Sequence, residues 1–142
     1  MDSIMDAVKE WHEYAERDLS SAKYLLNMRP VPLEIIAYLC QQCAEKYLKS
    51  YLVYNDQDVI KTHDLVELIK LCAEFEKEFL SLEKQCTILF KYVTDTRYPR
   101  QKLELNDYDI KKALEYAEVV KNFVLNKIQE VDTSNIKTDE QK

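Results

Sequence analysis

The 142-residue chain contains no glycine, and this absence limits its possible folds and ligand sites more than any other feature. The phosphate-binding loops of Rossmann domains, P-loop proteins and kinases all need glycines where the backbone approaches phosphate closely. The short turns of β-hairpins depend on residues with positive φ, which glycine adopts most readily. The sequence therefore excludes these three kinds of loop and argues against a fold rich in hairpins.

Apolar residues recur with a helical period along most of the chain, which predicts amphipathic helices joined by short connections. The first two helices are expected over about 3–28 and 33–54, and the second is apolar on most sides. The last is expected to end near residue 130. The predicted fold is an all-α, antiparallel four- or five-helix up-and-down bundle over residues 1–131, followed by a disordered polar tail over 132–142.

Caps and prolines locate the other helices of the bundle. Thr62 is a candidate N-cap for a third helix, which should turn Phe75 towards the core. Ser81 is a candidate start for a fourth helix, and Pro99 should stop it. Asn106 is a candidate cap for the fifth helix.

The charge and apolar content limit the environment and partners of the chain. The formal net charge is -6 and the sequence pI is about 5.0, which argues against binding long nucleic acid through a general positive field. No apolar run approaches the roughly 20 residues that span a bilayer. The first residues lack the basic and apolar regions of a secretory signal. We expect a cytoplasmic protein.

Four cysteines could suggest a metal or redox centre, since two of them form a Cys-x-x-Cys motif (Cys40 and Cys43, with Cys72 and Cys86 elsewhere). Both cysteines of the motif fall on the most apolar face of the predicted second helix. Cysteine on such a face behaves as a small hydrophobe. The sequence therefore favours reduced thiols packed in a core over a zinc or redox site, and predicts neither a metal nor a cofactor.

Polar residues interrupt the predicted second helix along one narrow stripe, formed by Gln42, Lys46 and Lys49. Glu45 and Lys49 are four residues apart, in the order that favours an ion pair on a helix. Two interpretations remain open. The stripe is either a solvated helix face or part of a ligand site in which lysines meet an anion.

A carboxylate also interrupts the apolar stripe of the first helix, at Asp18. A partly desolvated carboxylate needs a cation or several hydrogen-bond donors. The candidate partners are Lys46, Lys49, Arg97 and His63. The alternative is that Asp18 lies at the edge of the stripe and reaches water.

The remaining candidates are two histidines and a short loop. His63 falls in the first turn of the predicted third helix, where a structural contact to backbone or carboxylate is expected, whereas His12 is expected on the surface. Pro99 extends Tyr98 and leaves Arg97 near the end of its helix. Arg97 then either braces that helix end or clamps an anion together with the lysines, and both interpretations predict a well-ordered side chain.

Taken together, these residues resemble the HEPN family, small α-helical domains named for higher eukaryotes and prokaryotes nucleotide-binding. The resemblance covers about residues 5–130 and rests on four motifs in order: Trp11…Asp18-Leu19, Gln42-x-Ala44-Glu45-Lys46-x-Leu48-Lys49, His63-x-Leu65 and Thr96-Arg97-Tyr98-Pro99. It implies a helical bundle that commonly forms a homodimer. It also implies pairing with a minimal nucleotidyltransferase in two-gene modules of the toxin–antitoxin kind.

Some members of the family are metal-independent ribonucleases with an arginine followed after four to six residues by a histidine. In that chemistry the histidine is a general acid or base and the arginine stabilises the charged transition state. No histidine follows Arg97 here, and His12 and His63 belong to other helices. The ribonuclease motif is therefore not carried over, although His63 or Glu104 could stand in for the missing base. No catalytic residue is assigned.

Three hypotheses for the function follow. The first is a non-enzymatic module that binds a nucleotide or phosphate, or an RNA ligand, and acts with a nucleotidyltransferase. Its ligand-binding residues would be Lys46, Lys49, His63 and Arg97, supported by Asp18, Gln42, Glu45 and Tyr98. The second is a ribonuclease toxin with a degenerate motif. The third is a purely structural dimerisation or adaptor domain.

Overall fold

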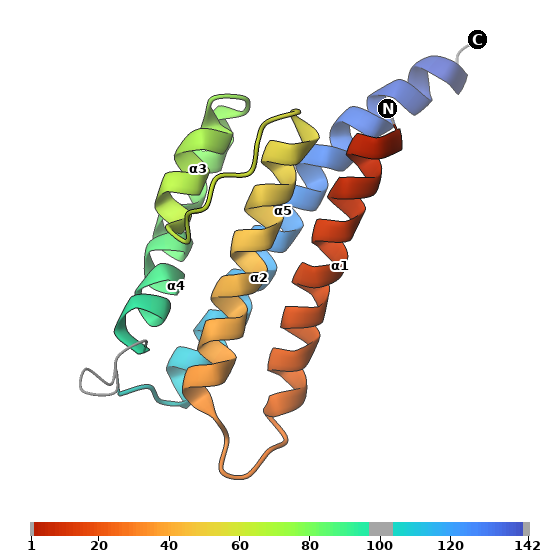
Figure 1. Cartoon of the computed structure of the whole chain (residues 1–142). Helices are drawn as coiled ribbons and strands as arrows, with labels where there is room; N and C mark the ends of the chain where they lie inside the picture. Colours follow the sequence, from red (N-terminus) through yellow and green to blue (C-terminus); the bar gives the residue numbers. More distant parts are fainter. Residues whose placement is uncertain (1, 97–103, 141–142) are drawn as a thin grey trace.

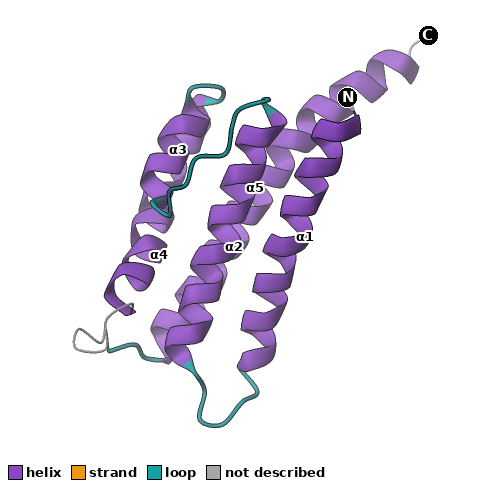
Figure 2. Ribbon diagram, in the orientation of Figure 1, coloured by secondary structure: helices purple, strands orange, loops and turns teal. Residues whose placement is uncertain are grey.

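The computed structural model describes residues 2–96 and 104–140 as a bundle of helices (Figure 1). In chain order the elements are α1 (Asp2–Leu25), α2 (Leu33–Tyr54), α3 (Leu65–Ala73), the 3-10 helix η1 (Lys77–Leu82), α4 (Glu83–Thr96) and α5 (Asp107–Glu140). Helices α1, α2, α4 and α5 alternate in direction, and Figure 2 draws no strand in the described part. The predicted all-α, antiparallel up-and-down bundle is confirmed.

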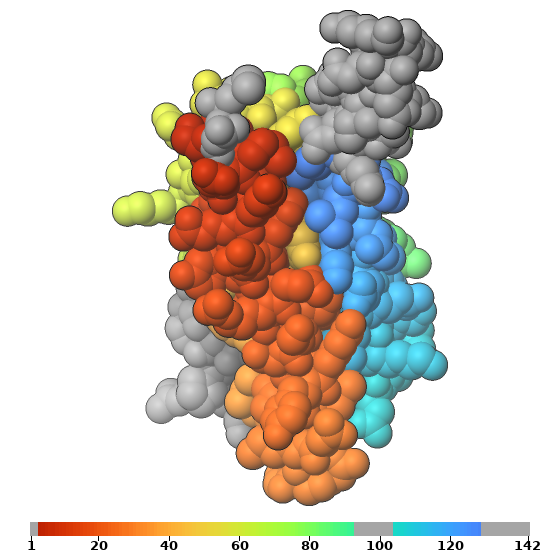
Figure 3. Space-filling model, turned by 90° about the vertical axis from the view of Figure 1, so that its right-hand side faces the viewer, coloured from red at the N-terminus to blue at the C-terminus, as the bar shows by residue number. Residues whose placement is uncertain are grey.

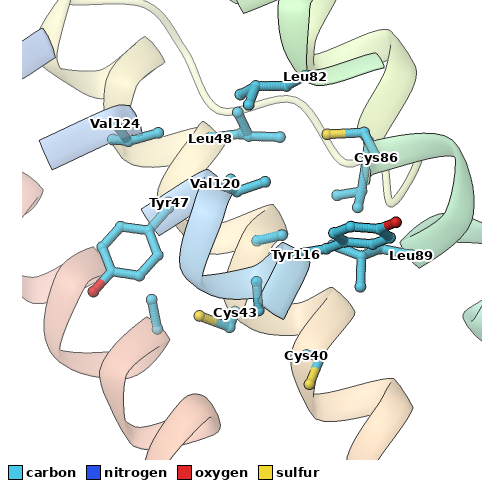
Figure 4. Packing of buried hydrophobic residues seen from close by; sticks show 14 of the residues in the cluster. Cys40, Cys43, Tyr47, Leu48, Leu82, Cys86, Leu89, Tyr116, Val120 and Val124 are labelled. Carbon is cyan, nitrogen blue, oxygen red and sulfur yellow. The ribbon is translucent and has the colours of Figure 1, made fainter. Parts of the chain in front are cut away.

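Helix α2 is the centre of the bundle, because it contacts α1, α3, α4 and α5. Apolar residues point inward on several of its sides, as expected for a helix surrounded by others. Figure 4 shows part of this core, in which α2 meets α4 and α5 (Cys40, Cys43, Tyr47, Leu48, Leu89, Val120 and Val124). The four cysteines are free and buried, so the prediction that they pack in the core is confirmed.

Helix α1 lies along one side of α2, with the α2–α3 connection, α3 and α4 on the other side (Figure 1). Its inward face is made of small or branched residues that are almost fully buried (Val8, Ala15, Leu19 and Ala22). Small side chains allow the two helices to approach closely. Seen from the side in Figure 3, α1 runs along the molecule beside α5.

The start of α3 differs from the sequence-based expectation, in which Thr62 is the cap. Asp64 is the N-cap, because its Oδ1 accepts hydrogen bonds from the backbone N–H groups of Val66 at 3.0 Å and Glu67 at 3.3 Å. The Thr62 hydroxyl instead donates to Glu67 and accepts from the backbone N–H of Asp64. An aspartate is as good a cap as a threonine, and it lies two residues closer to the apolar face that packs on α2. His63 therefore precedes the helix and does not belong to its first turn.

The end of α3 also differs from the expectation. The helix stops at Ala73, so Phe75, expected to face the core, is 42% exposed. The chain then turns into η1, which buries Phe79 completely. Helix α4 accordingly starts at Glu83, two residues after the predicted Ser81.

Helix α5 is longer than the sequence predicts, since it continues to Glu140 where an end near residue 130 and a disordered segment from 132 were expected. No glycine or proline occurs after residue 130, so nothing in the backbone chemistry forces the helix to stop. The division of the chain into a domain over 1–131 and a tail over 132–142 stays a prediction. Among the described helices, none combines the length and apolarity needed to cross a membrane.

Candidate functional site

Asp18 of α1 forms an ion pair with Lys46 of α2. The two side chains are 18% and 24% exposed, so both charges are largely withdrawn from water. This confirms the expectation that Asp18 has a cationic partner, and it selects Lys46 from the four candidates. The pair joins the two helices.

A second polar cluster, the Glu45 network, consists of Gln41, Glu45, Lys49 and His63. The Glu45 carboxylate accepts hydrogen bonds from Lys49 Nζ at 3.0 Å and from Gln41 Nε2 at 3.2 Å. One of its oxygens also lies 3.0 Å from His63 Nδ1. The side chains of Glu45 and Lys49 are only 5% and 7% exposed, so this is a buried ion pair with hydrogen bonds that satisfy the remaining lone pairs.

The Glu45 network holds the connection between α2 and α3 against α2. Gln41 donates a further hydrogen bond to the backbone carbonyl of His63, at 3.0 Å. The ring of His63 is 63% exposed, although its Nδ1 faces Glu45. Because a carboxylate can only accept, the Nδ1–H donates and Nε2 is the ring nitrogen directed away from the network.

The predicted stripe on α2 is therefore divided between two contacts. Lys46 contacts Asp18 of α1. Lys49 contacts Glu45, whose carboxylate also meets His63 in the segment that leads into α3. Gln42, the third member of the stripe, donates to the Gln41 side chain at 2.9 Å. The structure thus brings together Lys46 with Asp18, and Lys49 with Glu45 and His63, in two separate groups. Arg97 and Tyr98 lie outside the described residues.

Gln41 is the residue of the second group that sequence reasoning missed. It is fully buried and bonds both Glu45 and the His63 backbone. Its spacing was a usable signal, since Gln41, Glu45 and Lys49 follow one another at intervals of four along one side of α2.

His12, expected on the surface, takes part in a half-buried contact between α1 and α2. Its Nε2 lies 2.8 Å from the Ser50 hydroxyl, and its ring lies 5.2 Å from that of Tyr47. Ser50 donates its one proton to the Tyr47 carbonyl, at 2.6 Å, so His12 must be the donor to Ser50. Burial lowers the pKa of His12 below its ordinary value, against the opposing effect of the Glu16 carboxylate.

A further set of contacts ties α1 to α2 and α5 through Glu16. Its carboxylate accepts from the Tyr47 hydroxyl at 2.6 Å and from Lys121 Nζ at 2.7 Å. Burial acts to raise the pKa of Glu16, but these hydrogen bonds prevail and hold it below its ordinary value. Burial, and then the bond to Glu16, raises the pKa of Tyr47. These residues join three helices.

A cavity of about 300 Å³ lies beside the Asp18–Lys46 pair. It is lined by Ala7, Glu10, Trp11 and Tyr14 of α1 and by Lys46. The guanidinium of Arg17 lies 5.1 Å from the centre of the Tyr14 ring. The cavity therefore has two aromatic walls, the ammonium group of Lys46 and the carboxyl group of Glu10, and we call it the Trp11 cavity.

Two other observations limit what the described residues can hold. A cavity of about 470 Å³ between α4 and the start of α5 is lined by Lys84, Lys112 and Tyr108, among others. We assign it no ligand, because one of its lining residues, Glu104, directly follows the segment 97–103, which lies outside the described residues. Within the described ranges, no group of three histidine, cysteine or acidic side chains is placed to hold a metal ion.

Comparisons with known proteins agree with this architecture. The family model described as "HEPN domain" matches residues 8–128. A solved structure, described as that of an archaeal HEPN homologue, superimposes with a TM-score of 0.66 at 26% sequence identity, covering 85% of this chain and 97% of the other. No curated protein matches the sequence. The chain belongs to the HEPN domain family.

Proposed function

We propose that this HEPN-domain protein is a non-enzymatic module that binds a nucleotide or another aromatic phosphate, and that it acts in the cytoplasm with a minimal nucleotidyltransferase. The observation that carries the binding part is the Trp11 cavity, in which the predicted ligand residue Lys46 stands beside two aromatic rings. A base can stack on an aromatic side chain with little dependence on its identity. An ammonium group is a suitable contact for phosphate.

The size and chemistry of the Trp11 cavity suit a small ligand. Its volume of about 300 Å³ is at the lower end of what ligand pockets in proteins offer, which favours a mononucleotide over a larger molecule. The other predicted lysine is less available, because Lys49 is buried against Glu45. We therefore assign the phosphate contact to Lys46 and keep Arg97 as a second basic group predicted from sequence alone.

The test uses Trp11, which is the only tryptophan of the chain and lines the cavity. AMP, ATP, GTP, a cyclic nucleotide and inorganic phosphate are titrated while tryptophan fluorescence is recorded. A nucleotide that stacks in the cavity quenches the emission in a saturable way. Lys46→Ala should weaken this binding at least about tenfold, the loss expected when a charged hydrogen bond is removed.

The matched control is Lys70→Ala, which removes an exposed lysine from α3 and should leave the titration unchanged. Each variant is first melted to establish that it is folded. Saturable quenching that is equal in the two variants would reject Lys46 as the contact. The absence of quenching by every ligand would reject the nucleotide site and favour the third hypothesis, a structural or adaptor domain.

The partner is tested separately from the ligand. The protein is co-expressed with a candidate minimal nucleotidyltransferase, and the mixture is examined by size-exclusion chromatography with light scattering. The proposal expects co-elution of the two proteins, and a homodimer when the chain is alone. Separate elution at micromolar concentration would reject the partnership but leave the Trp11 cavity untouched.

One observation favours a second candidate, a ribonuclease of unusual design. His63 is exposed, and its Nδ1 is held by the buried Glu45, which leaves Nε2 as a possible proton acceptor. If this is correct, purified protein cleaves RNA without metal, and both His63→Ala and Arg97→Ala abolish cleavage. Cleavage that survives both substitutions comes from a contaminant or another site.

A further inference from the structure

The Asp18–Lys46 pair raises a question about the Trp11 cavity, because the ammonium group that would bind phosphate already has a carboxylate partner. A phosphate oxygen and a carboxylate oxygen make the same kind of contact with an ammonium group. Both side chains of the pair are more than three-quarters covered, so Lys46 has little room to serve two anions at once.

The position of Asp18 on α1 places it in line with the cavity wall. Ala7, Trp11 and Tyr14 follow one another at helical spacing, and Asp18 is four residues beyond Tyr14. The carboxylate is thus at the end of the same side of α1 that forms the wall. It meets Lys46 at the point where the aromatic wall ends.

We propose that Asp18 is a built-in competitor for the anion position on Lys46, and that it makes the Trp11 cavity selective for aromatic phosphates over simple anions. This inference rests on the proposed function. A ligand must displace the carboxylate and then remain beside its negative charge. Inorganic phosphate offers no ring contact to offset this cost, and adenosine has no charge with which to displace Asp18. AMP offers both.

The experiment compares the wild-type chain with Asp18→Asn, using Trp11 fluorescence and three probes: AMP, adenosine and inorganic phosphate. Asparagine keeps the size of the side chain and removes its charge. We expect AMP to bind the variant roughly tenfold more tightly, which is a usual size for coupling between two contacts on one group. Inorganic phosphate should become a measurable competitor of AMP in the variant, and adenosine affinity should stay the same.

A matched control is Asp56→Asn, which neutralises an aspartate in the connection after α2. Asp56 has a φ of 57°, a conformation that asparagine also tolerates, so the substitution removes charge with little strain. It should leave AMP affinity unchanged. The double variant Asp18→Asn with Lys46→Gln should not show the increased affinity for AMP, because the cation that binds the phosphate is absent.

The outcomes separate this inference from the proposed function. If no probe changes the fluorescence of either protein, the proposed function fails. If the wild type binds AMP and Asp18→Asn binds it equally or less tightly, the competitor role fails and Asp18 is only a brace between helices. If Asp18→Asn increases the affinities for AMP and adenosine equally, the competitor role also fails, because the charge of the ligand is then not the cause. If Asp18→Asn does not fold, Asp18→Ser is used under the same criteria.

Discussion

The ring of His12 lies half-buried between Ser50 and Tyr47, and its lowered pKa makes the stability of the fold depend on pH. Below the ordinary histidine value of about 6.5, the unfolded chain takes up a proton that the folded chain resists. The free energy of unfolding should therefore fall as the pH is lowered from about 7 to about 5.5. Above the pKa that His12 has in the unfolded chain, the ring is neutral in both states and this loss of stability disappears.

Urea unfolding of the wild type and of His12→Gln over that pH range measures this contribution. Removal of the imidazole should flatten the curve, and the difference between the two proteins should shrink as the pH falls. Glu16 affects stability only at lower pH, because the ordinary pKa of its carboxyl group is about 4.5 and the folded protein lowers it further. A His12→Gln curve with the same slope as the wild type would contradict the prediction.

Glu45 is the residue on which the buried polar contacts of α2 depend. Glu45→Gln leaves the Lys49 ammonium buried without a counter-charge, at 7% exposure. We expect a loss of about 3–5 kcal/mol in the free energy of unfolding, as for other buried pairs broken on one side. The matched control is Glu115→Gln, which breaks the exposed pair with Lys112 and should change the free energy of unfolding far less, because water screens that pair. Similar losses in the two variants would show that Lys49 reaches water.

At the scale of single elements, α3 depends on its cap because it has only nine residues. Helices this short are marginal on their own. Asp64→Ala should lower the free energy of unfolding by about 1 kcal/mol, whereas Asp64→Asn, which retains a capping oxygen, should cost a few tenths at most. Chemical denaturation of the two variants measures the difference. If Asp64→Asn and Asp64→Ala lower the free energy of unfolding equally, the charge of the carboxylate matters and the capping hydrogen bonds do not.

The elements also show where helix prediction from sequence reaches its limit. The bounds of α2 were predicted to the residue, because Pro30 and Pro32 separate two long periodic segments, whereas α1 ends at Leu25, three residues before its predicted end. Between residues 62 and 83 the prediction was less accurate. Thr62 and Asp64 are both good caps, and only packing on α2 selects the second. The 3-10 geometry of η1, which buries Phe79, has no 3.6-residue period to reveal it.

At the scale of the whole molecule, the four cysteines report on global unfolding. Burial raises the pKa of Cys40 and of Cys86 to about 12, and it also raises the values of the other two. The thiolate is the reactive form, so the native protein should react slowly with Ellman's reagent near neutral pH. All four thiols should react rapidly in denaturing urea. Fast reaction of one or two thiols in the native protein would show a local opening of the core.

Only part of the candidate site could be predicted from the sequence. Asp18, Lys46, Glu45 and Lys49 could be singled out from sequence, because a charged residue within an apolar helical stripe is costly unless it is paired. The Glu45–Lys49 pair followed from its i,i+4 spacing, but the partner of Asp18 could not be assigned, since it had four candidate cations. Helical periodicity says which side of its own helix a residue occupies. It does not say how far each helix slides or turns against its neighbours.

The order of residues alone predicts the all-α class, an apolar second helix and cysteines packed in the core. It also marks Asp18 as a carboxylate that interrupts an apolar stripe. These depend on spacing within one helix, which is local. The tertiary structure decided that Lys46 meets Asp18, that His63 meets Glu45, and that His12 is half-buried. Each of these contacts joins segments far apart in the chain, so it depends on the relative rotation and translation of whole helices, which packing of the complete core determines.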